Sequence, residues 1–253
     1  MPNAPIVLIL GDTPDARALA EAVADRGTRG IYAHAGRRTS KAPPPLPTRI
    51  GSFGGPEGLA QYLVEAGITH IVDATQPFAE TMSESAVRAA EMTNLPLVAF
   101  GPAAWTAEPE DTWINAPDMA TAVAALDTDP QRIFLAIGRK GVAQFASLPQ
   151  HHYVLRLATP PRSTPPLPHH DIVVDRSAGD TASEVAFLQD HGIGLIVARN
   201  TGAPTGYPML EAARALGLPV LMIDRPHLTA RKNLHRISDV LTWLDQNDVK
   251  NVS

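Results

Sequence analysis

Hydrophobic and polar positions follow one repeating pattern along the chain. Short runs rich in β-branched and other apolar residues lead into glycine-containing turns, which are followed by stretches with apolar residues every three or four positions. This order is typical of βαβ units, which build a mostly parallel sheet. The runs predict strands at Ile6–Leu10, Gly30–His34, Thr69–Asp73, Leu97–Phe100, Ile133–Ile137, Tyr153–Leu157, Asp171–Val174, Leu195–Ala198 and Val220–Ile223.

Local signals specify the ends of two helices. Thr13 is a suitable N-cap for the first helix, and Gly27 ends it. The apolar stripe expected on that helix consists of Ala16, Leu19, Ala20 and Val23. In the second half, Thr181 and Glu184 have the spacing of a capping box, and Gly192 is expected to close that helix.

The two halves of the chain share a sequence pattern. Residues 66–72 (AGITHIV) align with residues 191–197 (HGIGLIV), 125 positions later. Tandem duplication and convergence of two ordinary βαβ units both explain this match. Periodicity is interrupted between Gly101 and Pro117, so we expect two α/β lobes with a division into residues 1–108 and 109–253.

The composition of the chain argues against several classes of protein. The chain has 253 residues, no cysteine and a net charge of −5. The missing cysteines exclude disulfides and sulfur-ligated zinc and suit a cytoplasmic location. No apolar run approaches the roughly 20 residues of a membrane span, and the acidic charge argues against a general nucleic-acid binder. The adjacent histidines at 151–152 and 169–170 lack helical i, i+4 spacing, so we expect no metal site.

The loop after the first predicted strand is a candidate phosphate site. Gly11, Asp12 and Thr13 lie between that strand and the first helix, where a dinucleotide-binding fold presents backbone N–H groups and the helix dipole. The loop lacks the full GxGxxG pattern, so an ordinary strand-to-helix turn remains the alternative.

The loop after the second strand bears on the choice of cofactor. Dinucleotide sites for NAD commonly have an acidic residue there, whereas an arginine receives the additional 2′-phosphate of NADP. This loop contains Gly36, Arg37 and Arg38 and no acidic residue. The sequence therefore predicts NADPH with Arg37 or Arg38 on the 2′-phosphate, the alternative being a solvated surface loop.

Two further loops follow predicted strands in equivalent positions, where open α/β sheets bind ligands. The first contains Ala74, Thr75, Gln76 and Phe78. The second contains Arg199, Asn200, Thr201 and Gly202, with Tyr207 shortly beyond. Its charge and hydrogen-bonding groups suit a carboxylate or an amide, although turn chemistry also favours such residues.

An ordered set of these segments resembles the precorrin-6A reductase family of cobalamin biosynthesis (CobK/CbiJ). The set comprises residues 11–17 (GDTPDAR), 35–37 (AGR), 73–79 (DATQPFA), 138–140 (GRK), 199–202 (RNTG) and 219–226 (PVLMIDRP). It spans nearly the whole chain. The chain departs from the family pattern at Asp12, where glycine is usual, at Gln76, where histidine is usual, and at Arg199, where lysine is usual.

The resemblance implies two Rossmann-like domains flanking a cleft, with NADPH on one side and a tetrapyrrole on the other. It implies hydride transfer to a macrocycle double bond of precorrin-6A, giving precorrin-6B, and makes other cobalamin-pathway enzymes candidate partners. That substrate carries many carboxylates, and the chain has 17 arginines against 4 lysines. A GC-rich genome would also explain this excess.

Positive side chains of the second half are therefore candidate substrate ligands. With the second loop named above, the expected substrate-binding residues are Arg139, Lys140, Arg176, Arg199, Asn200, Thr201, Gly202 and Tyr207. Arg156 and Arg162 are further candidates. Asp73, Tyr207 and water remain open as proton donors, so no catalytic residue is assigned.

Two other functions remain open from the sequence. A cobalt-precorrin-6A reductase of the anaerobic branch would need no protein ligand for the cobalt. A non-catalytic two-lobed protein that binds an anionic metabolite would show closure without turnover.

Overall fold

The chain forms two compact units. The computed structural model describes residues 4–34, 36, 45–175 and 179–246, and the side chain of Lys140 lies outside the described part. Unit 1 comprises Met1–Ala103 together with His227–Ser253, and unit 2 comprises Ala104–Pro226. The chain therefore leaves unit 1 once and returns to it after completing unit 2.

Unit 1 is built on a parallel sheet. Its strands are β1 (Ile6–Leu10), β2 (Arg29–His34), β3 (Thr48–Ile50), β4 (His70–Asp73), β5 (Leu97–Phe100) and β12 (Lys232–Leu234). Their order is β12-β5-β4-β1-β2-β3, and each neighbouring pair runs parallel. Read from the β3 edge, this is the strand order of a doubly wound dinucleotide-binding sheet. Such sheets bind their ligand where the strand order reverses, and here the order reverses between β1 and β4.

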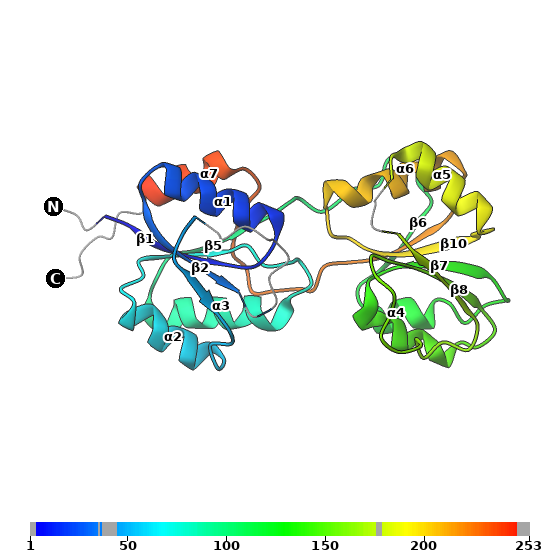
Figure 1. Ribbon diagram of the computed structural model, residues 1–253, viewed down its shortest axis with the longest axis horizontal. Coiled ribbons are helices and arrows are strands. Elements are labelled where there is room, and N and C mark those ends of the chain that lie inside the picture. Colours follow the sequence, from blue (N-terminus) through cyan, green and yellow to red (C-terminus); the bar gives the residue numbers. More distant parts are fainter. Residues whose placement is uncertain (1–3, 35, 37–44, 176–178, 247–253) are drawn as a thin grey trace. The chain divides into compact units, whose positions relative to one another are not determined.

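Helices cover both faces of this sheet. They are α1 (Pro14–Asp25), α2 (Pro56–Glu65), α3 (Glu80–Thr93) and α7 (Ile237–Gln246). Figure 1 shows α1 and α7 on one face and α2 and α3 on the other. Successive residues of a strand point to opposite faces. Accordingly Val7 packs in one apolar cluster with Leu19 and Trp243, while Leu8 packs in another with Leu63.

Unit 2 repeats this topology. Its strands are β6 (Trp113–Ala116), β7 (Arg132–Ala136), β8 (His152–Leu157), β9 (His170–Val174), β10 (Leu195–Arg199) and β11 (Val220–Ile223). Their order is β6-β11-β10-β7-β8-β9, again with parallel neighbours. Strands β7, β8, β10 and β11 therefore occupy the positions that β1, β2, β4 and β5 occupy in unit 1.

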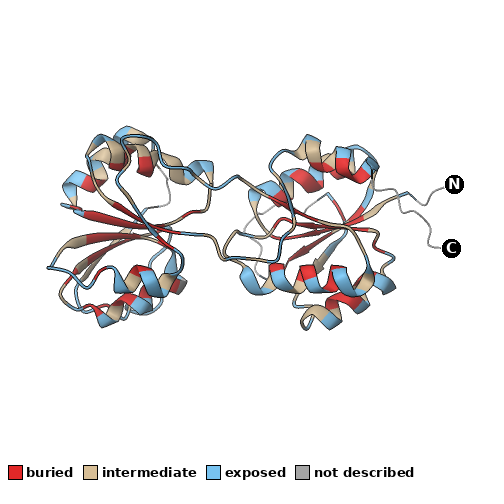
Figure 2. Ribbon diagram, turned by 180° about the vertical axis from the view of Figure 1, so that it is seen from behind, coloured by how far each residue is buried: buried red, intermediate tan, exposed pale blue. Residues whose placement is uncertain are grey.

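The covering layers of unit 2 differ in their helix types. They contain α4 (Met119–Ala124), the 3₁₀ helix η1 (Arg139–Ser147), α5 (Thr181–Asp190), the 3₁₀ turn η2 (Pro204–Gly206) and α6 (Tyr207–Ala215). Helices α5 and α6 pack together on one face, and α4 lies on the other in contact with η1 (Figure 1). Figure 2 shows buried strands at the centre of each unit and helices exposed on their outer faces.

The edge strands correct the predicted domain division. After β5 the chain forms β6, which pairs with β11; after β11 it forms β12, which pairs with β5. Residues 227–253 were expected in the second domain, yet they belong to unit 1. The physical reason is burial, because Val240, Trp243 and Leu244 of α7 lie in the apolar cluster that contains α1.

The predicted fold class and strands are confirmed in their main features. Each of the nine expected strands exists, with bounds that differ by at most one residue at either end. Thr13 caps α1 by accepting a 3.0 Å hydrogen bond from Ala16 N–H. The Thr181 capping box is wrong: Asp180 caps α5, and Glu184 bonds to Gly179 N–H instead. Within the described residues, no helix combines the length and apolar character needed to cross a membrane.

Candidate functional site

The turn between β1 and α1 packs directly against the loop that follows β4. Gly11 N–H donates to Ala33 O over 2.9 Å, and its φ of 134° lies in a region that favours glycine. A Cβ on Gly11 would lie 2.3 Å from Ala74 O. Thr13 Oγ1, while capping α1, donates to the same carbonyl oxygen over 3.1 Å. The predicted residues Gly11, Thr13 and Ala74 therefore meet at the N-terminus of α1.

Asp73 ends β4 and organises the loop that follows. This residue is 2% exposed, and its Oδ1 accepts hydrogen bonds from Thr75 N–H at 3.1 Å and Thr75 Oγ1 at 2.6 Å. Thr75 Oγ1 also lies 3.1 Å from Ser83 Oγ of α3. Asp73 Oδ2 forms an ion pair with Arg231. Because both oxygens accept hydrogen bonds inside unit 1, the geometry gives Asp73 a structural role and not that of a proton donor.

The side chain of Asp12 interacts with β2. Tyr32 O–H donates to Asp12 Oδ1 over 3.5 Å, at the limit of a hydrogen bond. Burial, with the nearby Asp12 carboxylate adding to it, raises the pKa of Tyr32 to about 12. Of the other predicted residues in unit 1, Gln76 is exposed and Phe78 is half-buried.

The end of β2 is the place where a dinucleotide fold recognises the adenosine ribose. His34 ends this strand with 6% exposure, and within the described residues its Nδ1 has no hydrogen-bond partner. Gly36 is exposed. Arg37 and Arg38, the predicted ligands of the 2′-phosphate, lie outside the described residues.

The loop after β10 carries the predicted residues Arg199 to Gly202 and is fixed from two directions. Asn200 is 7% exposed, and its side chain accepts from Trp105 N–H at 2.7 Å and donates to Trp105 O at 2.9 Å. Arg225 donates to Asn200 O at 3.0 Å and to Thr201 O at 2.8 Å. Gly202 has a φ of 69°, so the turn uses the left-handed conformation that glycine favours.

Two predicted arginines lie near the carboxyl ends of β7 and β10. Arg199 ends β10, and one of its terminal nitrogens lies 3.2 Å from where a Cβ on Gly141 would stand, so the glycine leaves room for it. Burial lowers the pKa of Arg199. Arg139 is exposed and donates to Thr159 O at 2.8 Å and to its Oγ1 at 2.9 Å. Arg176 and the side chain of Lys140 lie outside the described part of the chain.

Tyr207, the first residue of α6, belongs to a polar chain that sequence reasoning did not find. Asp111 accepts from Arg214 Nε at 2.9 Å and from a terminal nitrogen of Arg214 at 3.1 Å. Hydrogen bonds to Asp111 and to Tyr207 raise the pKa of Arg214. Burial acts to raise the pKa of Asp111, but the hydrogen bonds from Arg214 and Glu108 N–H outweigh it and hold the pKa below its usual range.

Comparison with known protein families decides what this arrangement belongs to. The family model described as precorrin-6x reductase CbiJ/CobK matches residues 6–245. The chain belongs to this family. A solved structure titled "CobK precorrin-6A reductase" has a TM-score of 0.85 and 43% identity, and the match covers 96% of each chain.

Individual members of the CbiJ/CobK family show how the resemblance is distributed. The Rhodobacter capsulatus protein named precorrin-6A reductase is 44% identical over 238 residues, which cover 94% of this chain and 95% of the relative. The Rhodococcus erythropolis protein of the same name is 39% identical over 240 residues, covering 94% and 96%. A Priestia megaterium protein named cobalt-precorrin-6A reductase is 27% identical over 238 residues, covering 88% and 91%.

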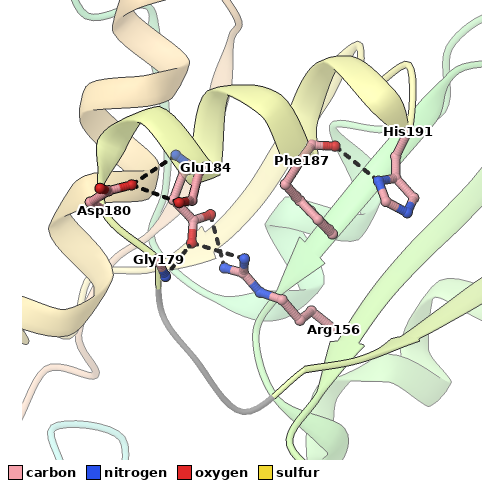
Figure 3. A network of polar contacts seen from close by, with 7 residues as sticks. Arg156, Gly179, Asp180, Glu184, Phe187 and His191 are labelled. Carbon is pink, nitrogen blue, oxygen red and sulfur yellow. Dashed lines mark hydrogen bonds and ion pairs between the residues drawn. The ribbon is translucent and has the colours of Figure 1, made fainter.

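Arg156, which the sequence offered as a further substrate ligand, has a different role in this CbiJ/CobK chain. It pairs with the 1% exposed Glu184 at 2.8 Å, and its guanidinium lies 4.7 Å from the ring centroid of Phe187 (Figure 3). Glu184 also accepts from Gly179 N–H at 3.2 Å. Arg156 therefore neutralises a buried carboxylate and packs on an aromatic ring.

A reductase needs a source of electrons, and unit 1 of this CbiJ/CobK member fits a dinucleotide better than unit 2. Its strand order, the close approach at Gly11 and the 12-residue helix α1 have the geometry typical of folds that bind a pyrophosphate. In unit 2 the equivalent strand β7 leads into η1, which has no side-chain cap.

Sequence reasoning missed Arg225 and Arg231, which hold the two loops. Arg225 lies in the segment 219–226 that contributes to the resemblance, but no role was expected for it. Its partners lie 24 and 25 positions away, and the partner of Arg231 lies 158 positions away. No local pattern marks contacts of that range.

Proposed function

We propose that this member of the CbiJ/CobK family is an NADPH-dependent precorrin-6A reductase of cobalamin biosynthesis. The observation that carries the proposal is identity of 44% and 39%, over 94% of the chain, to relatives named precorrin-6A reductase. Identity to the named cobalt-precorrin-6A reductase of Priestia megaterium is 27%. We therefore propose the metal-free precorrin-6A, and not the cobalt-containing form, as the substrate.

NADPH is proposed to bind unit 1. Support comes from the α1 N-terminus, the glycine turn and the loop 35–47, which contains Arg37, Arg38 and Lys41 and no acidic residue. An acidic residue at that place would favour the free ribose hydroxyls of NAD. The proposed cofactor-binding residues are Gly11, Asp12, Thr13, Gly36, Arg37, Arg38, Ala74, Thr75, Gln76 and Phe78.

The tetrapyrrole is proposed to bind unit 2 through its carboxylates. A protein of net charge −5 holds a polyanion only where positive charge is concentrated locally. The proposed substrate-binding residues are Arg139, Lys140, Arg176, Arg199, Asn200, Thr201, Gly202 and Tyr207. Arg199 is the strongest of these, because it ends a central strand and is partly desolvated, which strengthens its attraction for an anion.

The chemistry divides between the cofactor and the chain. Bound NADPH supplies the hydride, which forms a C–H bond at one carbon of the macrocycle double bond, and a proton completes the neighbouring carbon. The residues of the chain hold the two reactants and exclude water. Tyr207 and water remain the proton sources, and no catalytic acid is assigned.

The decisive experiment follows NADPH absorbance anaerobically after addition of precorrin-6A, with product mass as the second readout and NADH as the control. We expect a gain of two hydrogens with NADPH preferred. Arg37→Ala should raise the KM for NADPH far more than it lowers kcat. Turnover with the cobalt-containing substrate alone would favour the anaerobic branch, and tight binding of both ligands without oxidation would indicate a binding protein.

A further inference from the structure

The connection that returns from unit 2 to unit 1 carries two partly buried arginines. Arg225 follows β11 by two residues and donates within unit 2, while Arg231 precedes β12 by one residue and donates within unit 1. Arg225 contacts the loop that follows the central strand β10, and Arg231 contacts Asp73, the last residue of the central strand β4. One segment of eight residues, 224–231, thus supports both candidate ligand loops.

Arg225 fixes the backbone of the loop after β10. Its Nε donates to Asn200 O at 3.0 Å, and a terminal nitrogen donates to Thr201 O at 2.8 Å. Two carbonyl oxygens are thereby held by the two-pronged side of one planar guanidinium. A lysine at this position presents a single point of charge and cannot reproduce that geometry.

Arg231 acts on the loop after β4 through a carboxylate. It forms an ion pair with Asp73 Oδ2, and the paired side chains are 15% and 1% exposed. The other oxygen of Asp73 accepts both the N–H and the hydroxyl of Thr75. Burial of a carboxylate is costly without an opposite charge, so Arg231 offsets the cost of burying Asp73, whose other oxygen orients Thr75.

We propose that Arg225 and Arg231 are positioning residues for two different ligands. Arg231 shapes the loop that binds the reductant, and Arg225 shapes the loop that binds the tetrapyrrole. Both act through other residues of the chain, namely Asn200, Thr201 and Asp73. This inference rests on the proposed function and deepens it, because it assigns separate effects on the two substrates to two arginines of one connecting segment.

The test is a steady-state comparison of Arg231→Ala and Arg225→Ala in the full chain, with both substrates varied. Arg231→Ala should raise the KM for NADPH about tenfold, the size expected when a charge-assisted hydrogen bond is lost, and leave the KM for precorrin-6A unchanged. Arg225→Ala should give the opposite pattern. Arg236→Ala is the control, because Arg236 is 79% exposed and pairs only with its near neighbour Asp239 among the described residues.

Conservative variants separate positioning from general structural support. Arg231→Lys should restore much of the NADPH affinity, because Asp73 needs one charged donor there. Arg225→Lys should restore little, because two carbonyl oxygens lose their shared fork. Asp73→Asn, which nearly preserves size, should reproduce the effect of Arg231→Ala. These variants keep the test decisive if an alanine variant fails to fold.

The outcomes distinguish this inference from the proposed function. Calorimetric titration of the wild-type chain with NADPH alone tests the function, and absence of binding overturns that proposal. If the wild type binds and oxidises NADPH while both arginine variants change the two KM values equally, or only in proportion to a fall in Tm, the positioning roles are refuted. A separated pattern with rescue by lysine at position 231 alone supports them.

Discussion

The two units share one strand order and differ in the segment that joins their equivalent first strands to the next helix. In unit 1, β1 leads through Gly11 into a 12-residue α-helix capped by Thr13. In unit 2, β7 leads through Gly138 into a 3₁₀ helix without a side-chain cap. A capped α-helix presents N–H groups and a positive dipole end to a phosphate. The same strand order is therefore combined with different strand-to-helix segments, and only the segment of unit 1 has the capped α-helix.

The loops after β4 and β10 show a second difference at equivalent positions. Strand β4 ends in Asp73, a buried carboxylate, whereas β10 ends in Arg199, a partly buried guanidinium. Each loop is nevertheless held by an arginine of the segment 224–231. An arginine therefore supports each of the two loops, although the strand before one loop ends in an acidic residue and the strand before the other ends in a basic residue.

The largest effect is expected from adding a methyl group to the turn after β1. In Gly11→Ala the new Cβ would lie 2.3 Å from Ala74 O, so the backbone at one of these two residues must move. The φ of 134° at position 11 is also unfavourable for alanine. Strain of this kind costs about 3 kcal/mol or more once overlap is added to the unfavourable dihedral angle. Urea denaturation should show a clear fall in midpoint.

Gly138→Ala is the matched variant in unit 2. Its φ is 73°, and a Cβ there meets no atom within 4 Å. Only its backbone conformation, with φ 73° and ψ 172° in a region that glycine favours, is penalised, at about 1–3 kcal/mol. Equal losses of stability in the two variants would show that the contact between Gly11 and Ala74 does not distinguish the units.

The fold was predictable wherever a strand is apolar enough to be buried on both faces. All nine expected strands exist: apolar runs such as residues 6–10 (IVLIL) form buried strands, and the β-branched run of β9 was also found, although β9 is a partly exposed edge strand. The missed strands β3, β6 and β12 are short edge strands of mixed polarity, with sequences TRI, WINA and KNL. Their pairing depends on the neighbouring strand, and the domain error at residues 227–253 has the same origin.

The candidate sites were predictable where glycine, a cap and a strand end occur together in sequence. Gly11, Thr13 and Ala74 were expected and do meet. Glu184 shows the limit, because its spacing from Thr181 fits a capping box while its carboxylate is used by Arg156. Contacts of that kind depend on which strands become neighbours, and local spacing does not contain this information.

The helix caps predict that α5 and α1 respond differently to acidic pH. Asp180 caps α5, and hydrogen bonds from the Ser183 hydroxyl and N–H hold its pKa below the usual range of an aspartate. Asp118 caps α4, and its pKa is lowered mainly by Thr121 N–H. A lowered pKa stabilises the folded state above the unfolded value, and that contribution is lost as the pH falls through the folded value. Thr13, the cap of α1, does not ionise.

We therefore expect hydrogen-exchange protection in α5 to fall below about pH 4, whereas the Thr13 cap gives α1 no corresponding loss. Asp180→Asn should retain the cap at neutral pH and remove this acid dependence, while Asp180→Ala should already lower protection of α5 at neutral pH, about fivefold. Protection factors measured by mass spectrometry resolve the two helices. Equal acid sensitivity of α5 in Asp180→Asn and the wild type would refute the role of the cap.

The smallest expected effect concerns one tyrosine in each unit. The pKa is raised to about 12 for both Tyr32 and Tyr153, by burial and the Asp12 carboxylate in the first case and by burial in the second. Asp12→Asn should lower the pKa of Tyr32 while leaving it above the ordinary value of about 10, since burial is the larger cause. Tyr153 should titrate as before. Phenolate absorbance recorded after a stopped-flow pH jump measures the ionisation of both tyrosines before the protein unfolds in alkali. The variant Tyr153→Phe shows which part of the signal belongs to Tyr153. A Tyr32 pKa that does not move would refute an interaction between the Asp12 carboxylate and the Tyr32 hydroxyl across their 3.5 Å contact.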